Sequence, residues 1–68
     1  MKTSLKVERA KNDFTQADLA ERVGVSRQTI NAIEKGRYNL SIVLALKLAH
    51  IFKVRVEDIF ELEQQDWE

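Results

Sequence analysis

The sequence has 68 residues, no cysteine and a formal net charge of zero, with 44% hydrophobic and 32% charged residues. This length provides for one domain with a small core, and the absence of cysteine excludes disulfides and thiolate metal sites. No apolar run reaches the roughly 18 residues that span a bilayer, and the charged stretch Met1–Ala10 lacks the apolar segment of a signal peptide, so we expect a cytoplasmic protein.

The two parts of the chain differ in the sign of their charge. Residues 1–40 contain eight Lys or Arg against five Asp or Glu, a net charge of +3. Residues 41–68 contain three basic against six acidic residues, a net charge of −3. This asymmetry favours an anionic partner on one side of the domain.

The spacing of apolar residues predicts an all-α protein with five helices. The first helix is expected over Ser4–Asn12. Thr15, followed three residues later by Asp18, forms an acidic variant of the capping box and starts a second helix that runs to about Val23. Gly24 ends this helix, because glycine adopts left-handed dihedrals without steric cost.

A third helix follows after a very short connection. Ser26 caps it, Ile30 and Ile33 face inward, and Gly36 lies just past its end. Only Gly24–Ser26 separates it from the second helix. A connection this short that contains glycine makes two helices cross steeply, which is the geometry of a helix-turn-helix motif.

Two further helices are predicted in the C-terminal part. Ser41 caps a helix over Ile42–Phe52, whose sequence IVLALKLAHIF is typical of a central buried helix. A shorter helix is expected over Val56–Leu62, with two acidic residues in its first turn, where the helix dipole favours them. We therefore predict one helix-turn-helix domain over residues 4–62 and a polar tail over residues 63–68, frayed apart from Trp67.

The outward side of the predicted third helix carries the residue types that read base pairs. A helix-turn-helix places its second helix in the major groove. There Arg27 is suited to guanine, Gln28 and Asn31 are suited to adenine, and Ala32 is suited to the methyl group of thymine. The alternative is an ordinary solvated helix surface. The tight turn and the caps of the two helices favour the DNA-binding interpretation over it.

Phosphate contacts are expected on both sides of this face. The start of the second helix has free backbone amides and a dipole that attract anions, although capping alone also explains Thr15. The basic and polar residues after the third helix are suited to the neighbouring strand, with ordinary surface charge as the alternative. The expected phosphate-binding residues are Thr15, Gln16, Ser26, Lys35, Arg37, Tyr38 and Asn39.

Residues 14–41, FTQADLAERVGVSRQTINAIEKGRYNLS, resemble the Cro/repressor-type helix-turn-helix of the Xre family. The pattern TQxxLAxxxGVSxxxIxxxExG is met at Thr15, Gln16, Leu19, Ala20, Gly24, Val25, Ser26, Ile30, Glu34 and Gly36. The resemblance covers about residues 4–62 and is strongest to short stand-alone transcriptional regulators. It implies a five-helix lambda-repressor-like fold, operator DNA as ligand and action as a homodimer, with bases read at Arg27, Gln28 and Asn31.

The resemblance also implies supporting roles for single residues. Gln16 is expected to bind a phosphate and brace the recognition helix, and Arg9 is expected to pair with Glu34 rather than leave two unpaired surface charges. Arg55 stands where Ser or Pro would start the fifth helix, which weakens that cap. Some short relatives also pair the tail, here around Glu61–Trp67, with the first six residues as a small ribbon.

A dimer follows from the small size of one reading helix. One copy reads only a few base pairs, whereas two copies about 34 Å apart read successive major grooves. We expect the two-fold contact at the end of the fourth helix and on the fifth helix, the alternative being that these side chains close the monomer core. The expected interface residues are Val54, Val56, Ile59, Phe60 and Trp67.

Other functions are less compatible with the sequence. The single His50 lies within the apolar fourth helix, and neither a phosphate-binding glycine loop nor a metal-ligand spacing is present. We therefore expect no enzyme, no cofactor, no membrane partner and no small-molecule ligand. The rival is a protein-interaction module such as an antitoxin, but a long toxin-wrapping tail is missing. A bare DNA-binding dimer blocks polymerase by occupancy, so repression is the default.

Overall fold

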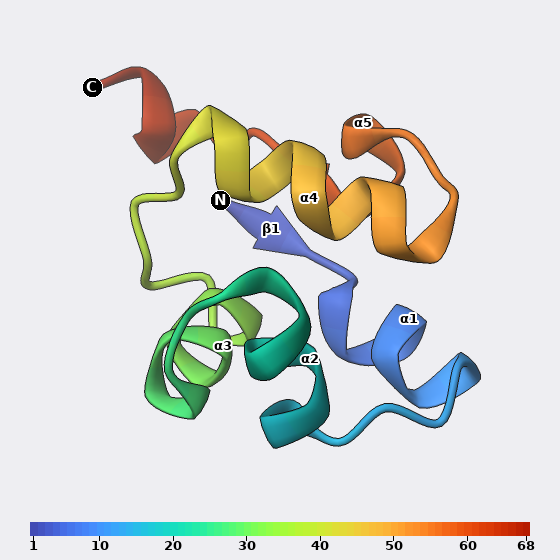
Figure 1. The fold of residues 1–68 in the computed structure, drawn as a ribbon. Coiled ribbons are helices and arrows are strands. Elements are labelled where there is room, and N and C mark those ends of the chain that lie inside the picture. The colour runs from blue at the N-terminus through green and yellow to red at the C-terminus, as the bar shows by residue number, and fades with distance from the viewer.

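The computed structural model describes residues 1–68 as a bundle of five α-helices with a small ribbon beside it (Figure 1). In chain order the elements are β1 (Lys2–Thr3), α1 (Leu5–Lys11), α2 (Gln16–Val23), α3 (Arg27–Glu34), α4 (Ile42–Phe52), α5 (Val56–Ile59), β2 (Phe60–Glu61) and the 3₁₀-helix η1 (Gln64–Trp67). The predicted five-helix fold is confirmed. No helix combines the length and apolarity that crossing a bilayer requires.

Side-chain caps start the three longest helices where the sequence predicted them. Thr15 Oγ1 accepts a hydrogen bond from the Asp18 amide at 3.0 Å. Ser26 Oγ and Ser41 Oγ each accept from the backbone amide three residues later, both at 3.1 Å. These bonds satisfy amides that a helix start otherwise leaves without a partner, so the sequence itself fixes where α2, α3 and α4 begin.

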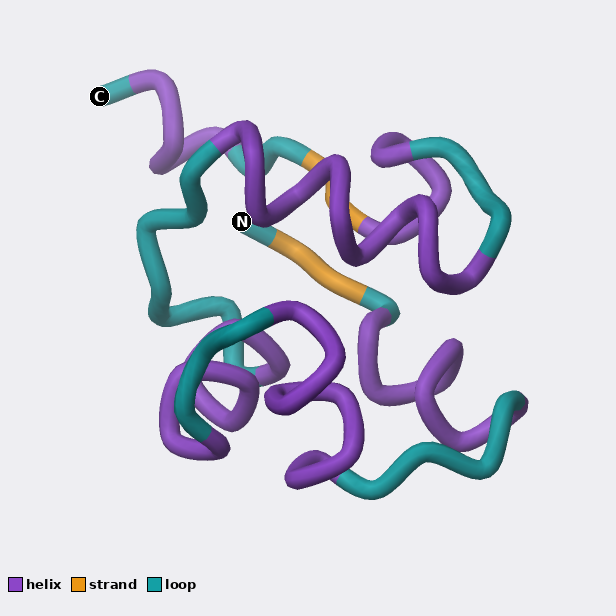
Figure 2. Tube along the Cα trace, in the orientation of Figure 1, coloured by secondary structure: helices purple, strands orange, loops and turns teal.

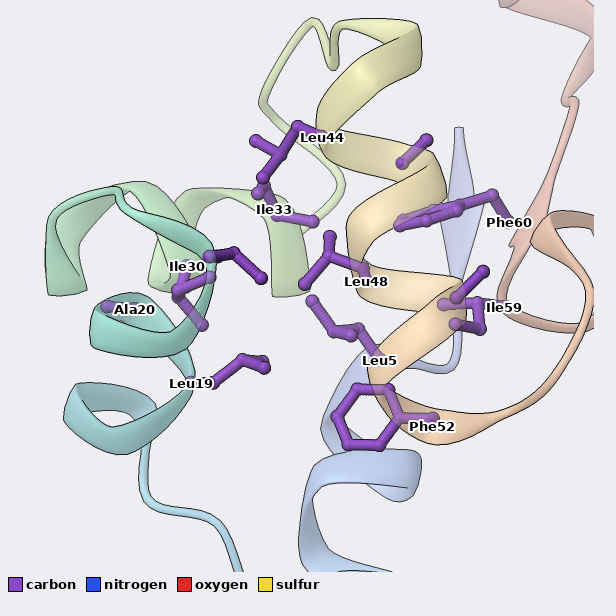
Figure 3. Packing of buried hydrophobic residues seen from close by; sticks show 13 residues of the cluster. Leu5, Leu19, Ala20, Ile30, Ile33, Leu44, Leu48, Phe52, Ile59 and Phe60 are labelled. Atoms are coloured by element: carbon purple, nitrogen blue, oxygen red, sulfur yellow. The ribbon is translucent and has the colours of Figure 1, made fainter.

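The core lies between α4 and the pair formed by α2 and α3, and side chains of α1, α5 and the ribbon complete it (Figure 3). All 13 buried residues are apolar. The largest fully buried side chains are Leu5, Leu19, Ile30, Ile33 and Leu48. Because α2 and α3 turn their apolar sides toward this core, their polar sides face solvent.

The helix α4 is central, but it is not buried on all sides as predicted. Leu44, Leu48 and Phe52, which are four residues apart, pack inward. This spacing places intervening positions on the opposite side of the helix. There Ile42 and Leu46 are 76% and 56% exposed. A domain of this size has only one core to cover the helix, so its outward apolar side chains remain on the surface.

The chain ends are joined by a two-stranded ribbon, shown in orange in Figure 2. Lys2 pairs with Glu61 and Thr3 with Phe60 in antiparallel register. The expected ribbon is therefore present, but it begins at Phe60, and the predicted fifth helix over Val56–Leu62 is too long. The extended backbone places the Phe60 side chain in the core, where it is 8% exposed, and gives its backbone a hydrogen-bonding partner.

The tail after the ribbon is ordered rather than frayed, which corrects the expectation for residues 63–68. Glu63 precedes η1, and its amide donates to Asp66 Oδ2 at 2.7 Å. The ammonium group of Met1 forms ion pairs with Glu63 at 3.0 Å and with Asp66 at 3.1 Å. Composition alone does not reveal the two Met1 ion pairs, because they join residues from opposite ends of the chain.

Candidate nucleic-acid interface

The connection between α2 and α3 has the tight geometry that the sequence predicts. Gly24 ends α2 in the left-handed conformation, with φ +78°, and its amide donates to the Ala20 carbonyl at 2.9 Å. The Val25 amide donates to the same carbonyl at 3.0 Å, and Ser26 then caps α3. The two helices therefore cross and pack as a unit (Figure 1).

The outward side of α3 carries the four residues predicted to read bases. Arg27 and Gln28 are exposed, and Asn31 and Ala32 are half-buried beside them. The two isoleucines of α3 point the other way and are buried in the core. The helix thus presents guanidinium and amide groups to solvent, which is the arrangement that base reading in a major groove requires.

A hollow of about 360 Å³ lies where the starts of α2 and α3 meet. Thr15 and Gln16 line it from α2, Arg27 lines it from α3 and Arg9 from α1, and Asp13 is the one carboxylate in its lining. The first-turn amides of α2 add partial positive charge at this place. The Arg27 guanidinium and the start of α2 therefore converge on a hollow suited to a backbone phosphate.

A half-buried polar network fixes this hollow against α3. Glu34 accepts hydrogen bonds from Arg9 Nε at 2.7 Å and from Gln16 Nε2 at 3.0 Å. The guanidinium also donates through Nη1 to the Phe14 carbonyl at 3.0 Å. The hydrogen bonds to Glu34 raise the pKa of Arg9. The implied pairing of Arg9 with Glu34 is confirmed, and it joins α1 and the start of α2 to the end of α3.

The remaining predicted phosphate contacts follow α3 in one surface loop. The exposed side chains there are Lys35, Arg37, Tyr38 and Asn39. Gly36 turns the chain out of α3 with φ +71°. Sequence reasoning missed the neighbour of this turn, since a Cβ at Gly36 would lie 2.7 Å from the carbonyl oxygen of Met1. Gly36 itself was the only sign of this close approach in the sequence, and a glycine at this position is also explained by a simple helix end.

The predicted dimer-interface residues do not share one environment. Ile59 and Phe60 are 2% and 8% exposed within the monomer, so they offer little surface to a partner chain. Both side chains fill the end of the core, as the alternative interpretation held. Val54 and Val56 are half-buried against the same core, whereas Trp67 is 77% exposed.

Comparisons with known sequences agree with this geometry. A family model described as Helix-turn-helix matches residues 5–59. The HTH-type transcriptional regulator MJ0272 of Methanocaldococcus jannaschii is 54% identical over 66 residues, which cover 97% of this chain and 100% of the relative. The HTH-type transcriptional regulator YgzD of Bacillus subtilis is 47% identical over 66 residues, with 97% and 100% covered.

Solved structures share the same fold. The restriction-modification controller protein C.AhdI from Aeromonas hydrophila has a TM-score of 0.74 and 30% identity, covering 82% of this chain and 85% of that chain. SinR, the master regulator for biofilm formation, was solved in complex with DNA and has a TM-score of 0.69 with 28% identity, covering 78% and 86%. The chain belongs to the Xre-type helix-turn-helix family of DNA-binding transcriptional regulators.

Proposed function

We propose that this protein is a sequence-specific transcriptional repressor that binds a palindromic operator in double-stranded DNA as a homodimer. The observation that carries this proposal is the outward side of α3, where Arg27 and Gln28 are exposed above a buried apolar side. Arg27 matches guanine with two hydrogen bonds, and Gln28 and Asn31 match adenine likewise. Ala32 provides a methyl contact for thymine.

Backbone contacts on both sides of this face set the register of the helix in the groove. Before α3 we assign them to Thr15, Gln16 and Ser26. After α3 we assign them to Lys35, Arg37, Tyr38 and Asn39. All these residues belong to the part of the chain with net charge +3, residues 1–40, which favours their approach to phosphates. SinR, which shares the fold, was solved with DNA.

The small size of the reading face favours a homodimer, and occupancy of a promoter by that dimer favours repression. A single α3 contacts too few bases for useful selectivity, and two copies about 34 Å apart read two half-sites on one face of the duplex. Repression requires only that a promoter be occupied, and a DNA-binding dimer provides that occupancy without a further activity.

In vitro selection of bound duplexes from a random pool tests this proposal. We expect a palindromic motif whose half-sites are centred about 10 base pairs apart, with binding that weakens steeply as salt rises. A pool that enriches no motif would overturn sequence-specific binding. An enriched motif without two-fold symmetry would overturn the homodimer while leaving specific binding intact.

A further inference from the structure

The amino group of Met1 lies between two carboxylates of the tail. Its nitrogen is 3.0 Å from Glu63 Oε1 and 3.1 Å from Asp66 Oδ1. The side chains of Met1 and Asp66 are only 22% and 24% exposed, so water screens this contact less than a pair on the open surface. One positive charge at the start of the chain therefore neutralises two negative charges near its end.

The backbone around Met1 holds this amino group in place. The next residue, Lys2, is paired with Glu61 in the ribbon. The carbonyl oxygen of Met1 lies against Gly36, since a Cβ at Gly36 would be 2.7 Å from it, and the Met1 side chain packs against the core. The amino group is thus fixed between the turn that follows α3 and the tail.

The same place contains a cation that was assigned to DNA. Met1, Arg37 and Asp66 line one hollow of about 440 Å³. Arg37 carries the only cationic side chain in this lining, and Asp66 carries the only carboxylate. Asp66 is already occupied, because its Oδ1 accepts from the Met1 amino group at 3.1 Å and its Oδ2 accepts from the Glu63 amide at 2.7 Å. Arg37 forms no ion pair and remains available to a phosphate.

We propose that the Met1 amino group is a modification site, and that its acylation turns Asp66 into an autoinhibitory partner of Arg37. This inference rests on the proposed contact between Arg37 and a phosphate. Acylation removes the positive charge of the amino group, so Asp66 loses its counter-ion. Arg37 is the other cation of the hollow, and a guanidinium binds a carboxylate through the same fork of N–H groups with which it binds a phosphate.

The acyl donor for this reaction is an acyl thioester. The neutral amine attacks the thioester carbonyl, an N–C bond forms, the C–S bond breaks, and the proton lost from nitrogen goes to the departing thiolate. The hydrogen bonds to Glu63 and Asp66 raise the pKa of the Met1 amino group and keep it protonated in the folded protein. Acylation therefore precedes the docking of Met1 against the tail.

Competition between Asp66 and a phosphate for Arg37 sets the size of the effect. An exposed ion pair is weak, so its formation should weaken binding of one copy to a half-site by about three- to fivefold. Two copies on a palindrome should then lose about tenfold or more. Because Arg37 is assigned to the DNA backbone, operator and random duplexes should lose affinity alike, and the slope of log Kd against log salt should flatten by about one per copy.

Chemical synthesis of the 68-residue chain with three forms of Met1 tests the inference. The amino group is unmodified, acetylated or dimethylated. The dimethylated amine is the matched control, because it has one N–H like the acetylated form but keeps its positive charge. Fluorescence anisotropy on the selected operator should show binding about tenfold weaker for the acetylated chain, and within about twofold of the unmodified chain for the dimethylated one. Circular dichroism checks that all three chains keep their helices.

Substitutions in the acetylated chain identify the inhibitory contact. Asp66→Asn keeps an acceptor for the Glu63 amide but removes the charge, so it should restore binding. Glu63→Gln removes an equal charge outside the hollow and should leave binding weak. In Arg37→Ala, acetylation should have no further effect.

The outcomes separate this inference from the proposed function. Equal affinity of the acetylated and unmodified chains would overturn the inference. So would an equal loss in the dimethylated chain, or a loss that persists in acetylated Asp66→Asn. All three results leave DNA binding intact. An unmodified chain that binds no duplex would overturn the proposed function, and the inference with it.

Discussion

Arg9 and Glu34 lie 25 residues apart and form an ion pair at 2.7 Å that joins α1 to the end of α3. Their side chains are only 16% and 5% exposed. The second carboxylate oxygen of Glu34 accepts from Gln16, so one buried carboxylate serves three elements. The position of α3 relative to the start of α2 therefore depends on a contact outside the proposed reading face.

Glu34→Ala should lower the free energy of unfolding by about 2–4 kcal/mol, because it leaves the Arg9 guanidinium and the Gln16 amide without their partner. Urea unfolding followed by circular dichroism measures this loss. Lys11→Gln removes a 3.9 Å pair with Glu8 in which the lysine side chain is 66% exposed, and it should change stability by less than about 0.5 kcal/mol. Similar losses in both variants would contradict the role of the half-buried network.

Arg27→Ala and Gln28→Ala should each weaken binding to the selected operator by about 1–3 kcal/mol and relax the base preference at one position. The reason is the loss of a two-hydrogen-bond contact with a single base. Fluorescence anisotropy on the operator and on duplexes with one base pair changed measures both effects. Discrimination between these duplexes that is the same in variants and wild type would show that another face reads the sequence.

Lys35→Ala should weaken binding to all duplexes alike, because Lys35 is assigned to a phosphate and not to a base. Its loss removes about one released counterion, so the slope of log Kd against log salt should flatten by about one. A salt titration on specific and random DNA measures this slope. An effect confined to the operator would reassign Lys35 to base reading.

Gly36→Ala should destabilise the protein more than Gly24→Ala. Both glycines have positive φ, at +71° and +78°, and a left-handed alanine costs about 1–2 kcal/mol at either position. At Gly36 the new Cβ would also lie 2.7 Å from the Met1 carbonyl, whereas nothing lies within 4 Å at Gly24. Thermal unfolding compares the Tm of the two variants. An equal loss of Tm would mean that the Met1 carbonyl moves away from the new Cβ without cost.

The capping box of α2 should make stability depend on acid. Hydrogen bonds from the Thr15 backbone and side chain lower the pKa of Asp18 below its usual 3.8. The Asp18 carboxyl therefore binds a proton more readily in the unfolded chain than in the folded protein. The stabilisation from the capping box is complete above pH 3.8 and is lost as the pH falls through the lower pKa of the folded protein. Asp18→Asn should lower Tm at pH 7, and the difference from wild type should shrink below the usual pKa.

The matched control for this pH dependence is Glu21→Gln, an exposed residue of α2 that removes the same charge without touching the cap. Its difference in Tm from the wild type should stay nearly constant over the same pH range. A shift with pH as large as that of Asp18→Asn would assign the effect to overall charge instead of the cap.

The part of the fold from α2 to α4 is predictable from sequence because local rules determine it. Thr15, Ser26 and Ser41 cap their helices through the amide three residues later, and Gly24 ends α2 in the conformation that glycine favours. Caps and turns depend on neighbours in the chain, and inward isoleucines determine which side of α3 is outward. The candidate reading face follows from these two facts.

The C-terminal part was predicted less well because contacts between distant residues determine it. Helical periodicity extends past Ile59, but pairing of Phe60 with Thr3 replaces the last turn with a strand. Besides its local cap, η1 is held by ion pairs with Met1, which no local pattern relates to the tail. The burial of Phe60 has the same cause, because it depends on its pairing with Thr3.

Backbone amide chemical shifts during titration with the selected operator test the central claim most directly. If the outward side of α3 reads base pairs, the largest changes fall on Arg27, Gln28, Asn31 and Ala32, with smaller ones at the start of α2 and in the loop after α3. Changes that leave α3 unaffected and gather on α1 or α5 would contradict the claim.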